Sequence, residues 1–502
     1  AVHYTSIALV IVHGIVLTPL YLRFMSEELY GAWLATGNLL SWIQLVDPGL
    51  SRIVQQRVAS AYGGRNFEAL PAILGTGLGL GTLAGCVPLA VIPLSGLVAG
   101  TLNLTPSDTA ALTWALQLGL LGTSVMMISF QVTAATLGLQ LSGSAGLIYI
   151  GAGLAGIGGT VALLYGGYGL AALPLGLLLR AGIYLFGNLA LLIAWQTRHL
   201  RRRPCVTRDE LRRYAALSSM TFIGRLGTML LLHSEAYVGA KVLGSGVIAI
   251  YALTGRAYEP VRLAAERFGP AFLPGLAHLA GEGKMTRVTE IAGRLLNLVG
   301  YLGLVGAACV IALNSVFVSL WVGPDLFGGQ MLTGLLGLSM AMGVVLSCWS
   351  EMVFAVGGIG HVEVMRAVEG VVKLGVQLAC IWFWGLIGLP IGACLGMLLV
   401  SGWYLPKLAA RLLQRSAGEE IRRWGGHLAR CVVMVGLGLL GHEVVAGIFA
   451  EWTWPRFILV SIPVGLVYAA IGLALQPAVW REAQAVFARI RGWLRRPVQT
   501  AP

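Results

Sequence analysis

The sequence predicts an all-α protein that crosses a membrane many times, and three observations carry this prediction. Of the 502 residues, 57% are hydrophobic and only 11% are charged, whereas a soluble domain has about 25% charged residues. Apolar runs of about 20 residues, the length that crosses roughly 30 Å of hydrocarbon, recur along the chain. A basic stretch at residues 197–214, with seven arginines, separates two long apolar halves.

Apolar windows of about 19 residues place fourteen spans along the chain. The spans are expected at residues 4–22, 31–47, 71–96, 109–136, 144–166, 169–196, 215–239, 246–270, 291–320, 329–356, 362–384, 387–405, 428–449 and 457–476. The boundary between the fifth and sixth spans is the weakest, because the glycine-rich connection at 166–169 barely interrupts the apolar run.

The basic stretch predicts the orientation of the chain. Each charge at mid-bilayer costs at least about 2.5–3.5 kcal/mol, so this stretch must lie in water. Lys and Arg accumulate in short cytoplasmic loops, and here the basic loops alternate with loops that hold little beyond Arg23, Lys241 and Arg456. We therefore expect a multi-pass protein of the cytoplasmic (inner) membrane with both termini in the cytoplasm. The same rule explains most of the net charge of +13, so no nucleic-acid partner is expected.

The end of the chain has a different pattern. Between Trp480 and Trp493, apolar residues recur at helical spacing with arginines between them. This is typical of an amphipathic helix that lies on the anionic lipids of the inner leaflet, and a solvated charged tail is the alternative.

The expected division of the chain is an N-lobe at 1–200, a C-lobe at 201–410, and two further spans with the basic helix at 411–502.

Three local motifs resemble a known family. They are Tyr30-Gly31-Ala32-Trp33-Leu34, then Asp47-Pro48-Gly49-Leu50 leading into Val58-Ala59-Ser60-Ala61-Tyr62, and Tyr251-Ala252-Leu253 through Phe272-Leu273-Pro274-Gly275-Leu276. Together they resemble the polysaccharide-transport (oligosaccharide flippase) branch of the multidrug/oligosaccharidyl-lipid/polysaccharide exporter superfamily. In layout the resemblance covers the whole chain.

This resemblance implies two six-helix lobes around a central cavity, with two extra helices. It also implies an alternating-access transporter, not an enzyme, that moves a polyprenyl-diphosphate-linked oligosaccharide for cell-surface polysaccharide synthesis. Polysaccharide synthases are then expected partners, and no cofactor is required. Family members commonly carry an acid in the seventh span, where this chain has Glu235 preceded by His233.

Four cations are expected at similar depth in four different spans. Counting about 1.5 Å per residue from the span ends places each about 15–17 Å deep; they are Arg180, Arg225, Arg256 and Lys373. Only Glu259 and Glu369 are expected near that level, so the layer is predicted to be net positive. Arginine forks bind phosphate oxygens, which suits a diphosphate headgroup. The alternative is that each cation pairs with a neighbouring acid and only holds the lobes together.

Two predicted spans carry charges at helical spacing. In the eighth span Arg256, Glu259, Arg262 and Glu266 fall on one face, and Arg262 is expected near the cytoplasmic mouth as a further substrate-binding residue. The eleventh span repeats the pattern with Glu363, Arg366, Glu369 and Lys373. Such stripes can also neutralise themselves through pairs three and four residues apart.

Carboxylates inside spans are candidates for ion coupling. A carboxylate in an apolar setting can carry a proton, or bind Na⁺ with help from other oxygens. The main candidates are Glu235, Glu259 and Glu369, and Asp47, His233 and His13 are weaker ones. Asp47 directly precedes Pro48, so a helix-capping role is the preferred interpretation there.

Other patterns carry no chemistry. Gly151-Ala152-Gly153-Leu154-Ala155-Gly156 matches a dinucleotide fingerprint, but no acid follows it before Asp209. The seven cysteines have no metal-like spacing and are interpreted as buried small residues.

Two functions compete with a flippase. One is a cation-coupled multidrug exporter, whose cationic substrates a positive cavity would repel. The other is a membrane glycan polymerase or ligase, which would need a large outer loop.

Overall fold

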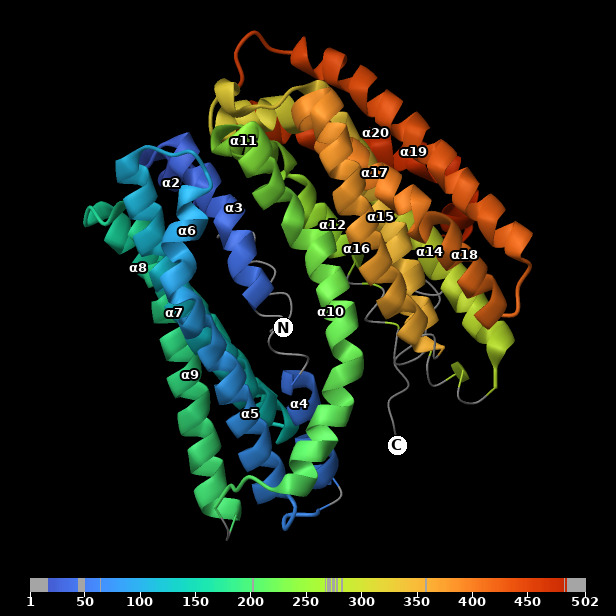
Figure 1. Cartoon of the computed structure of the whole chain (residues 1–502). Coiled ribbons are helices and arrows are strands. Elements are labelled where there is room, and N and C mark those ends of the chain that lie inside the picture. Colours follow the sequence, from blue (N-terminus) through green and yellow to red (C-terminus); the bar gives the residue numbers. More distant parts are fainter. Residues whose placement is uncertain are drawn as a thin grey trace, which may run out of the picture. The chain divides into compact units, whose positions relative to one another are not determined.

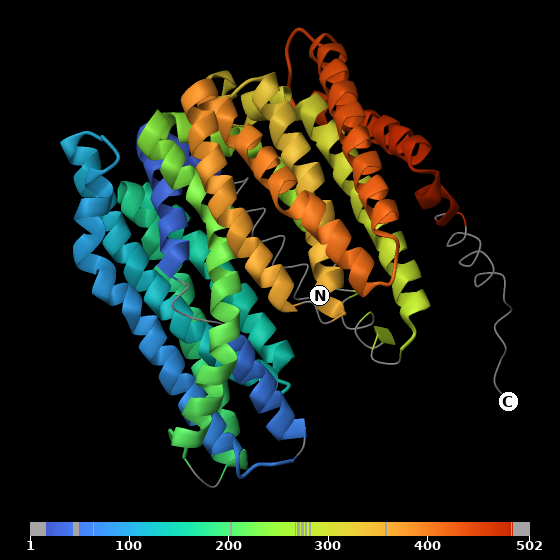
Figure 2. The same ribbon diagram turned by 45° about the vertical axis from the view of Figure 1, so that its right-hand side comes forward.

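A computed structural model describes residues 17–43, 50–63, 65–200, 203–266, 283–356 and 359–482, with a few isolated positions besides. Within these ranges the backbone alone is described at 37–43, 216–226, 228–234, 359–360 and several single residues. All regular elements in the described part are helices (Figures 1 and 2). Nine helical segments there are long and apolar enough to cross a membrane.

The helices divide into two compact units. The first contains Ala1–Ala252 with Glu363–Leu389, and the second contains Leu253–Val362 with Pro390–Pro502. The division predicted from the sequence, at residues 200 and 410, stays a prediction.

Among the described residues, the first unit holds eleven α-helices, two of them not in full, and three short 3₁₀ turns. In chain order they are α2 Thr18–Phe24, α3 Glu27–Ile43, α4 Leu50–Gly63, α5 Leu70–Val91, η3 Ile92–Leu94, α6 Ser95–Gly100, α7 Pro106–Gly138, α8 Ser142–Tyr165, η4 Gly169–Ala171, α9 Ala172–His199, α10 Arg208–Leu243, most of α11 Ser245–Gly255, most of α16 Ile359–Trp384, and η6 Gly385–Ile387. Helix α7 packs along α9, α5 and α4, and α9 packs along α8.

Local sequence explains where these helices begin and break. Helix α7 starts at Pro106, which lacks an N–H and suits a first helical position, and Thr105 Oγ1 accepts a hydrogen bond from the Asp108 amide at 3.2 Å. The predicted span 71–96 is instead α5 followed by η3 and α6. Pro88 and Pro93 remove helical hydrogen bonds there, so the last turns are irregular.

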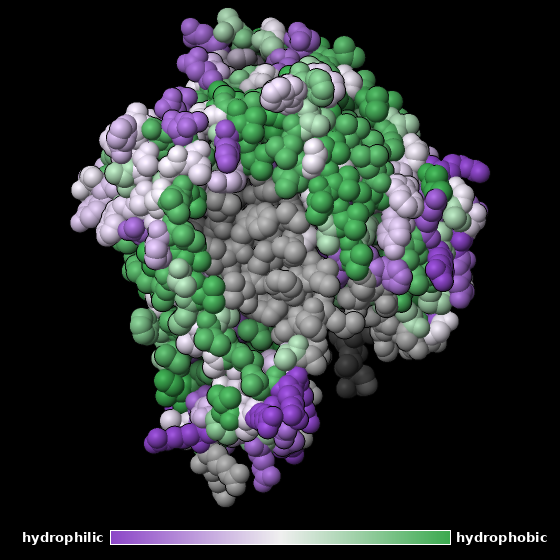
Figure 3. All heavy atoms as spheres, viewed as in Figure 1, coloured by the Kyte–Doolittle hydropathy of each residue, from purple (hydrophilic) through white to green (hydrophobic). Residues whose placement is uncertain are grey.

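Hydrogen bonds and an ion pair hold the basic stretch against other helices of the first unit. Helix α9 ends at His199 and α10 begins at Arg208, so several of its arginines lie on helix ends. The Cys205 amide donates to the Pro71 carbonyl at 3.0 Å, and the Thr207 amide donates to Thr76 Oγ1 at 3.1 Å. Arg57 on α4 pairs with Glu210 on α10 at 2.7 Å. Hydrophilic residues gather at this end of the unit, and apolar residues cover the helices above it (Figure 3).

The second unit is built around one long helix. Its elements are α12 Tyr258–Glu266, α14 Met285–Trp321, η5 Pro324–Leu326, α15 Gln330–Ala355, α17 Gly388–Leu399, α18 Ser401–Leu412, α19 Ala417–Ala446 and α20 Trp454–Leu475. Helix α14 packs against α15, α19, α20 and α12. Its 37 residues extend over about 55 Å, which is longer than the roughly 30 Å of hydrocarbon.

The predicted eighth span, 246–270, is not one continuous helix. Helix α11 ends at Gly255 and α12 begins at Tyr258, so Arg256 lies in the turn between them. Pro260 explains the break, because it cannot donate to the Arg256 carbonyl and its ring would clash there. Arg256 therefore lies outside the helix that carries Glu259 and Arg262, so the prediction of one continuous span is wrong, although the Arg256 side chain still reaches Glu259 three residues on.

Polar side chains satisfy the backbone at this break. Asn314 Nδ2 on α14 donates to the Thr254 carbonyl at 2.9 Å, and Thr254 Oγ1 accepts from the Gly328 amide at 2.9 Å. The Tyr258 hydroxyl donates to the Thr333 carbonyl at 2.8 Å. Within a membrane, an interrupted helix is stable only where neighbours take up the freed hydrogen-bonding groups.

The remaining predictions on the fold have mixed outcomes. The predicted twelfth span, 387–405, is η6, α17 and α18, with a break at Val400. The first predicted span and the basic helix after Trp480 fall mostly on residues outside the described part, as do His13 and Asp47. Four cysteines are buried, but Cys86 and Cys205 are exposed, so the interpretation of all seven as buried residues is wrong for those two.

Candidate functional site

An ion pair joins two helices of the first unit. Lys373 Nζ on α16 lies 3.0 Å from Glu235 Oε2 on α10, and both side chains are mostly buried, with 13% and 22% exposure. Lys373 was predicted to bind substrate and Glu235 to couple an ion. The structure brings these two residues together, so neither charge faces an apolar environment alone.

Two further side chains complete the surroundings of Glu235. Gln377 Nε2, one turn after Lys373 on α16, donates to Glu235 Oε2 at 2.9 Å and to the Leu389 carbonyl at 3.0 Å. The Tyr251 hydroxyl on α11 donates to Glu235 Oε1 at 3.1 Å. Three donors from two other helices thus converge on one carboxylate. We name Glu235, Tyr251, Lys373 and Gln377 the Glu235 cluster.

The cluster also contains an unsatisfied oxygen. Gln377 is 1% exposed, and its Oε1 atom has no hydrogen-bond partner among the described residues. A buried polar atom without a partner is uncommon and asks for an explanation. An amide oxygen beside a carboxylate is a suitable pair of ligands for a small cation.

Small residues let the helices of the cluster approach closely. A Cβ atom on Gly227 of α10 would lie 2.4 Å from the Ala367 backbone nitrogen on α16. A Cβ on Gly239 would lie 2.4 Å from Ile248 Cδ1 on α11. Close approach through glycine is a common way to pack membrane helices, and here it brings Glu235 within reach of Lys373.

We expect Gly227→Ala to destabilise the first unit, because backbone atoms of α16 cannot yield to the added methyl group. A loss of about 1–3 kcal/mol is typical of overpacking. The matched control is Gly375→Ala on α16, where no atom lies within 4 Å of the added Cβ; alanine should be neutral or stabilising there. Thermal unfolding of the purified protein in detergent measures both, and equal melting temperatures for the two variants would contradict this packing argument.

Arg180 on α9 occupies a different environment. Its Nη2 donates to the Tyr149 hydroxyl on α8 at 3.1 Å, and its guanidinium carbon lies 5.3 Å from the centre of that ring. Its stem packs on Gly156, where a Cβ would come within 2.8 Å of the Arg180 Cβ. In the described part of the chain, no acid forms an ion pair with Arg180.

The other predicted substrate-binding residues are Arg256 and Arg262 in the second unit and Arg225 on α10. Arg256 Nη1 pairs with Glu259 Oε2 at 2.9 Å. Arg262 on α12 is half-buried. The side chain of Arg225, like that of His233, lies outside the described residues, although its position on α10 is described.

The acids change the predicted charge of the layer. The sequence predicts only Glu259 and Glu369 near the level of the cations, but Glu235 is in contact with Lys373. Glu369 is buried, with 6% exposure. Helix α10, Arg208–Leu243, is longer at both ends than the predicted span 215–239. Counting residues from the ends of that span therefore gave the wrong position for Glu235 relative to α16. Lys373 and Arg256 each have a carboxylate partner, as the alternative prediction held.

Two members of the cluster, Gln377 and Tyr251, are not among the residues predicted from the sequence. Gln377 follows Lys373 by four residues, so the two share a helix face, and this spacing could have identified it. Tyr251 gives no such signal, because a tyrosine in an apolar run is more often part of the packed interior. Within the described residues, no group of three or more His, Cys, Asp or Glu side chains could hold a metal ion.

Comparisons by sequence find no relative. No protein-family model matches the chain, and no curated protein matches it. Comparison of structures does find similar proteins. A lipid II flippase, MurJ, in an inward closed conformation has a TM-score of 0.60 at 13% identity, and the match covers 94% of this chain and 98% of that one.

Multidrug transporters are similar as well. An inward-facing MATE family transporter of the MOP superfamily has a TM-score of 0.59 at 13% identity, with 86% of this chain and 94% of that one covered. The Vibrio cholerae MATE transporter VcmN in the bent form has a TM-score of 0.53 at 15% identity, covering 83% and 98%. This chain has the fold of the MOP superfamily. The likeness and the long apolar helices of the described part indicate a multi-pass membrane protein, and identities of this size show the fold alone.

Proposed function

We propose that this protein is a flippase that moves a polyprenyl-diphosphate-linked oligosaccharide across the cytoplasmic membrane by alternating access, for the synthesis of cell-surface polysaccharide. The observation that carries the proposal is the extent of the structural match. The lipid II flippase covers 94% of this chain, whereas the MATE transporters above cover 83–86%. The motifs that resemble oligosaccharide flippases support the same substrate class.

The charges within the helices fit an anionic lipid-linked substrate. The proposed substrate-binding residues are Arg180, Arg225, Arg256, Arg262 and Lys373. Arg180 is the clearest candidate, because it makes neutral contacts with Tyr149 and no ion pair with a described acid. Its guanidinium retains donors for phosphate oxygens. Lys373 and Arg256 would have to leave Glu235 and Glu259 to bind a diphosphate.

Coupling is assigned to the Glu235 cluster, with Glu259 and Glu369 as further candidates. A proton or Na⁺ that neutralises Glu235 would weaken its attraction to Lys373 and free the ammonium for the substrate. Gln377 Oε1, which lacks a hydrogen-bond partner among the described residues, would supply a second oxygen ligand to Na⁺. Binding of cation and substrate is then linked, since each changes the affinity for the other by the same factor.

The first experiment separates the flippase from a multidrug exporter, which is the second candidate because MATE transporters match the fold with a TM-score of 0.59. Purified protein in vesicles is given either a lipid-diphosphate sugar or a cationic dye. Translocation of the lipid-linked sugar, with accumulation of that lipid on the inner leaflet of cells lacking the protein, supports the flippase. Transport of the dye alone contradicts it.

We expect Glu235→Gln to remove the response of transport to an imposed pH or Na⁺ gradient. A coupling free energy of about 1–3 kcal/mol changes the affinity for the substrate about 5–150-fold when the cation binds, and the neutral side chain would lose this effect. The matched control is Glu451→Gln, at an exposed acid between α19 and α20. A variant that keeps the full response at normal protein levels would show that coupling lies elsewhere.

A further inference from the structure

A small basic cavity lies within the second unit, apart from the Glu235 cluster. It has a volume of about 20 Å³, is partly open to the outside, and is bordered by helices α14, α15 and α19 and by the residue that follows α20. Its polar lining consists of Asn297, Trp349, Arg423, His427, Arg430 and Gln476. Neither the substrate proposal nor the coupling proposal uses any of these residues.

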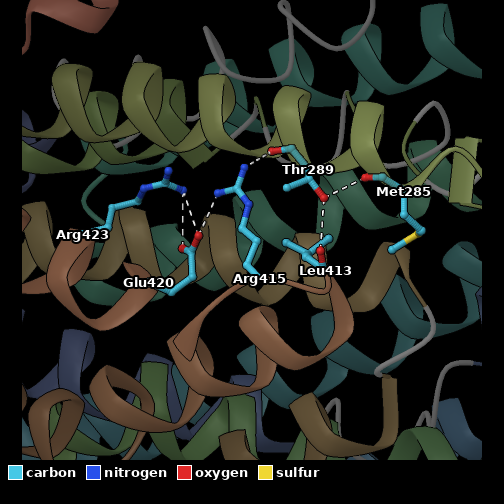
Figure 4. A network of polar contacts seen from close by, with 6 residues as sticks. All are labelled: Met285, Thr289, Leu413, Arg415, Glu420 and Arg423. Carbon is cyan, nitrogen blue, oxygen red and sulfur yellow. Dashed lines mark hydrogen bonds and ion pairs between the residues drawn. The ribbon is translucent and has the colours of Figure 1, made fainter. Parts of the chain in front are cut away.

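The cavity has an excess of positive charge. Arg423 Nη1 lies 3.1 Å from Glu420 Oε1, but Glu420 also pairs with Arg415 at 2.7 Å (Figure 4). One carboxylate therefore serves two guanidinium groups. Arg430 forms no ion pair with an acid in the described part of the chain. Arg415, Arg423 and Arg430 thus outnumber Glu420, and the excess charge faces the cavity through Arg423 and Arg430.

The arginines are held in place and keep free donors. Arg415 Nη2 donates to the Thr289 carbonyl at 2.5 Å, which ties Glu420 and Arg423 to α14 (Figure 4). Arg423 uses only Nη1 for Glu420. In the orientation that satisfies both of its amide atoms, Gln476 accepts from Arg430 Nη1 at 3.3 Å and donates to the Asn297 carbonyl at 2.9 Å. The other guanidinium nitrogens of Arg423 and Arg430 make no hydrogen bond to the described residues and are available to an anion.

A buried donor in the same cavity also lacks an acceptor. Trp349 lines the cavity and is only 1% exposed, yet its indole N–H has no hydrogen-bond partner among the described residues. Indole can only donate, so the missing group must be an acceptor. His427 does not supply it. Its Nε2 donates to the Ala341 carbonyl at 3.0 Å, which leaves Nδ1 as an acceptor, but no hydrogen bond joins Nδ1 to the indole among the described residues. Two cations and an unsatisfied donor around one space match the oxygens of a phosphate group.

The position of the cavity identifies the source of the phosphate. Helix α20 has 22 residues, so it extends over about 33 Å and just crosses the hydrocarbon. Gln476 follows its last residue, which places the cavity where the hydrocarbon ends. The same end of the unit carries Lys284, Arg287 and Arg422, and the charge pattern assigns that end to the cytoplasm. Basic pockets between helices on this side bind anionic lipid headgroups.

We propose that this cavity binds the phosphate of an anionic inner-leaflet phospholipid through Arg423, Arg430 and the indole N–H of Trp349. All of its lining residues precede Trp480 in the chain. The site also does not depend on the proposed transport function, because a lipid bound here would contact α14, α15 and α19 whatever the protein transports.

Native mass spectrometry of the purified full chain, titrated with phosphatidylglycerol and with phosphatidylcholine, tests the proposal. We expect tighter binding of phosphatidylglycerol. Arg430→Gln and Trp349→Phe should each weaken the tightest bound lipid, Arg430→Gln by about tenfold or more, as the loss of a charge-assisted hydrogen bond predicts. The matched control is Arg422→Gln, since Arg422 is exposed on the same helix and lines no part of the cavity.

Each other outcome overturns part of the proposal. Equal weakening by Arg422→Gln would mean that surface charge alone attracts the lipid. Equal affinity for phosphatidylcholine would remove the anionic specificity. Displacement of phosphatidylglycerol by inorganic phosphate at the same concentration would show that the cavity takes a free anion and no lipid. Unchanged binding by folded Arg430→Gln and Trp349→Phe would exclude the cavity as the site.

Discussion

Replacing Lys373 with methionine will lower the stability of the protein by about 3–5 kcal/mol, the usual cost of removing one member of a buried ion pair. The ammonium lies 3.0 Å from Glu235 Oε2, and the two side chains are 13% and 22% exposed. Without Lys373 the carboxylate keeps only Gln377 and Tyr251 as the donors described above, and its charge stays in a largely apolar setting. Thermal or denaturant unfolding in detergent measures the loss.

A second substitution distinguishes the pair from simple loss of packing. Because Glu235→Gln removes the uncompensated charge, the double variant with Lys373→Met should regain much of the stability that the single variant lost. Lys241→Met is the matched control, since Lys241 is exposed in the last turn of α10 and should change stability little. A double variant less stable than Lys373→Met would refute the electrostatic account.

Glu420→Gln will have an effect of similar size in the second unit. Glu420 is 1% exposed and binds Arg415 at 2.7 Å and Arg423 at 3.1 Å. An amide in its place would leave two guanidinium groups close together without their shared anion. We expect a loss of about 3–5 kcal/mol, visible as earlier unfolding of the purified protein.

The neighbouring residue provides the control for this prediction. Glu419 precedes Glu420 in the first turn of α19 but is exposed. Glu419→Gln therefore removes the same charge from the same helix end without touching the arginines. If both variants unfold at the same temperature, the helix dipole, which favours an acid at either position, would explain the effect without the buried ion pairs.

The helices could be predicted from the sequence because their signals are local. Apolar runs set the positions of α7, α14 and α15, and the seven arginines at 197–214 separated α9 from α10. Breaks within apolar runs were harder to predict. The break after Gly255 depends on Pro260 and also on Asn314. Asn314 lies on another helix, α14, and its side chain donates a hydrogen bond to the Thr254 carbonyl. Hydropathy contains no information about that contact.

The site was predictable by residue type but not by pairing. An acid and a lysine inside apolar runs are costly to insert, which was enough to single out Glu235 and Lys373. Their contact depends on how α10 and α16 cross at Gly227, a property of two segments far apart in the chain. The same limit hid the cavity of the second unit, because Trp349 and Arg430 give no combined signal until α15 and α19 are packed together.

The interruption between α11 and α12 also has a mechanical consequence. In a continuous helix each carbonyl is bonded to the following turn, so a change of direction must break hydrogen bonds. Here the Thr254 carbonyl is bonded to Asn314 on α14, and Pro260 has no proton to offer the Arg256 carbonyl. Two backbone hydrogen bonds are described across the interruption, from the Arg256 amide to the Leu253 carbonyl and from the Glu259 amide to the Arg256 carbonyl, both at 3.2 Å. A change of direction there would have to open these short turn bonds, whereas the bond from Asn314 to the Thr254 carbonyl does not belong to the helical ladder.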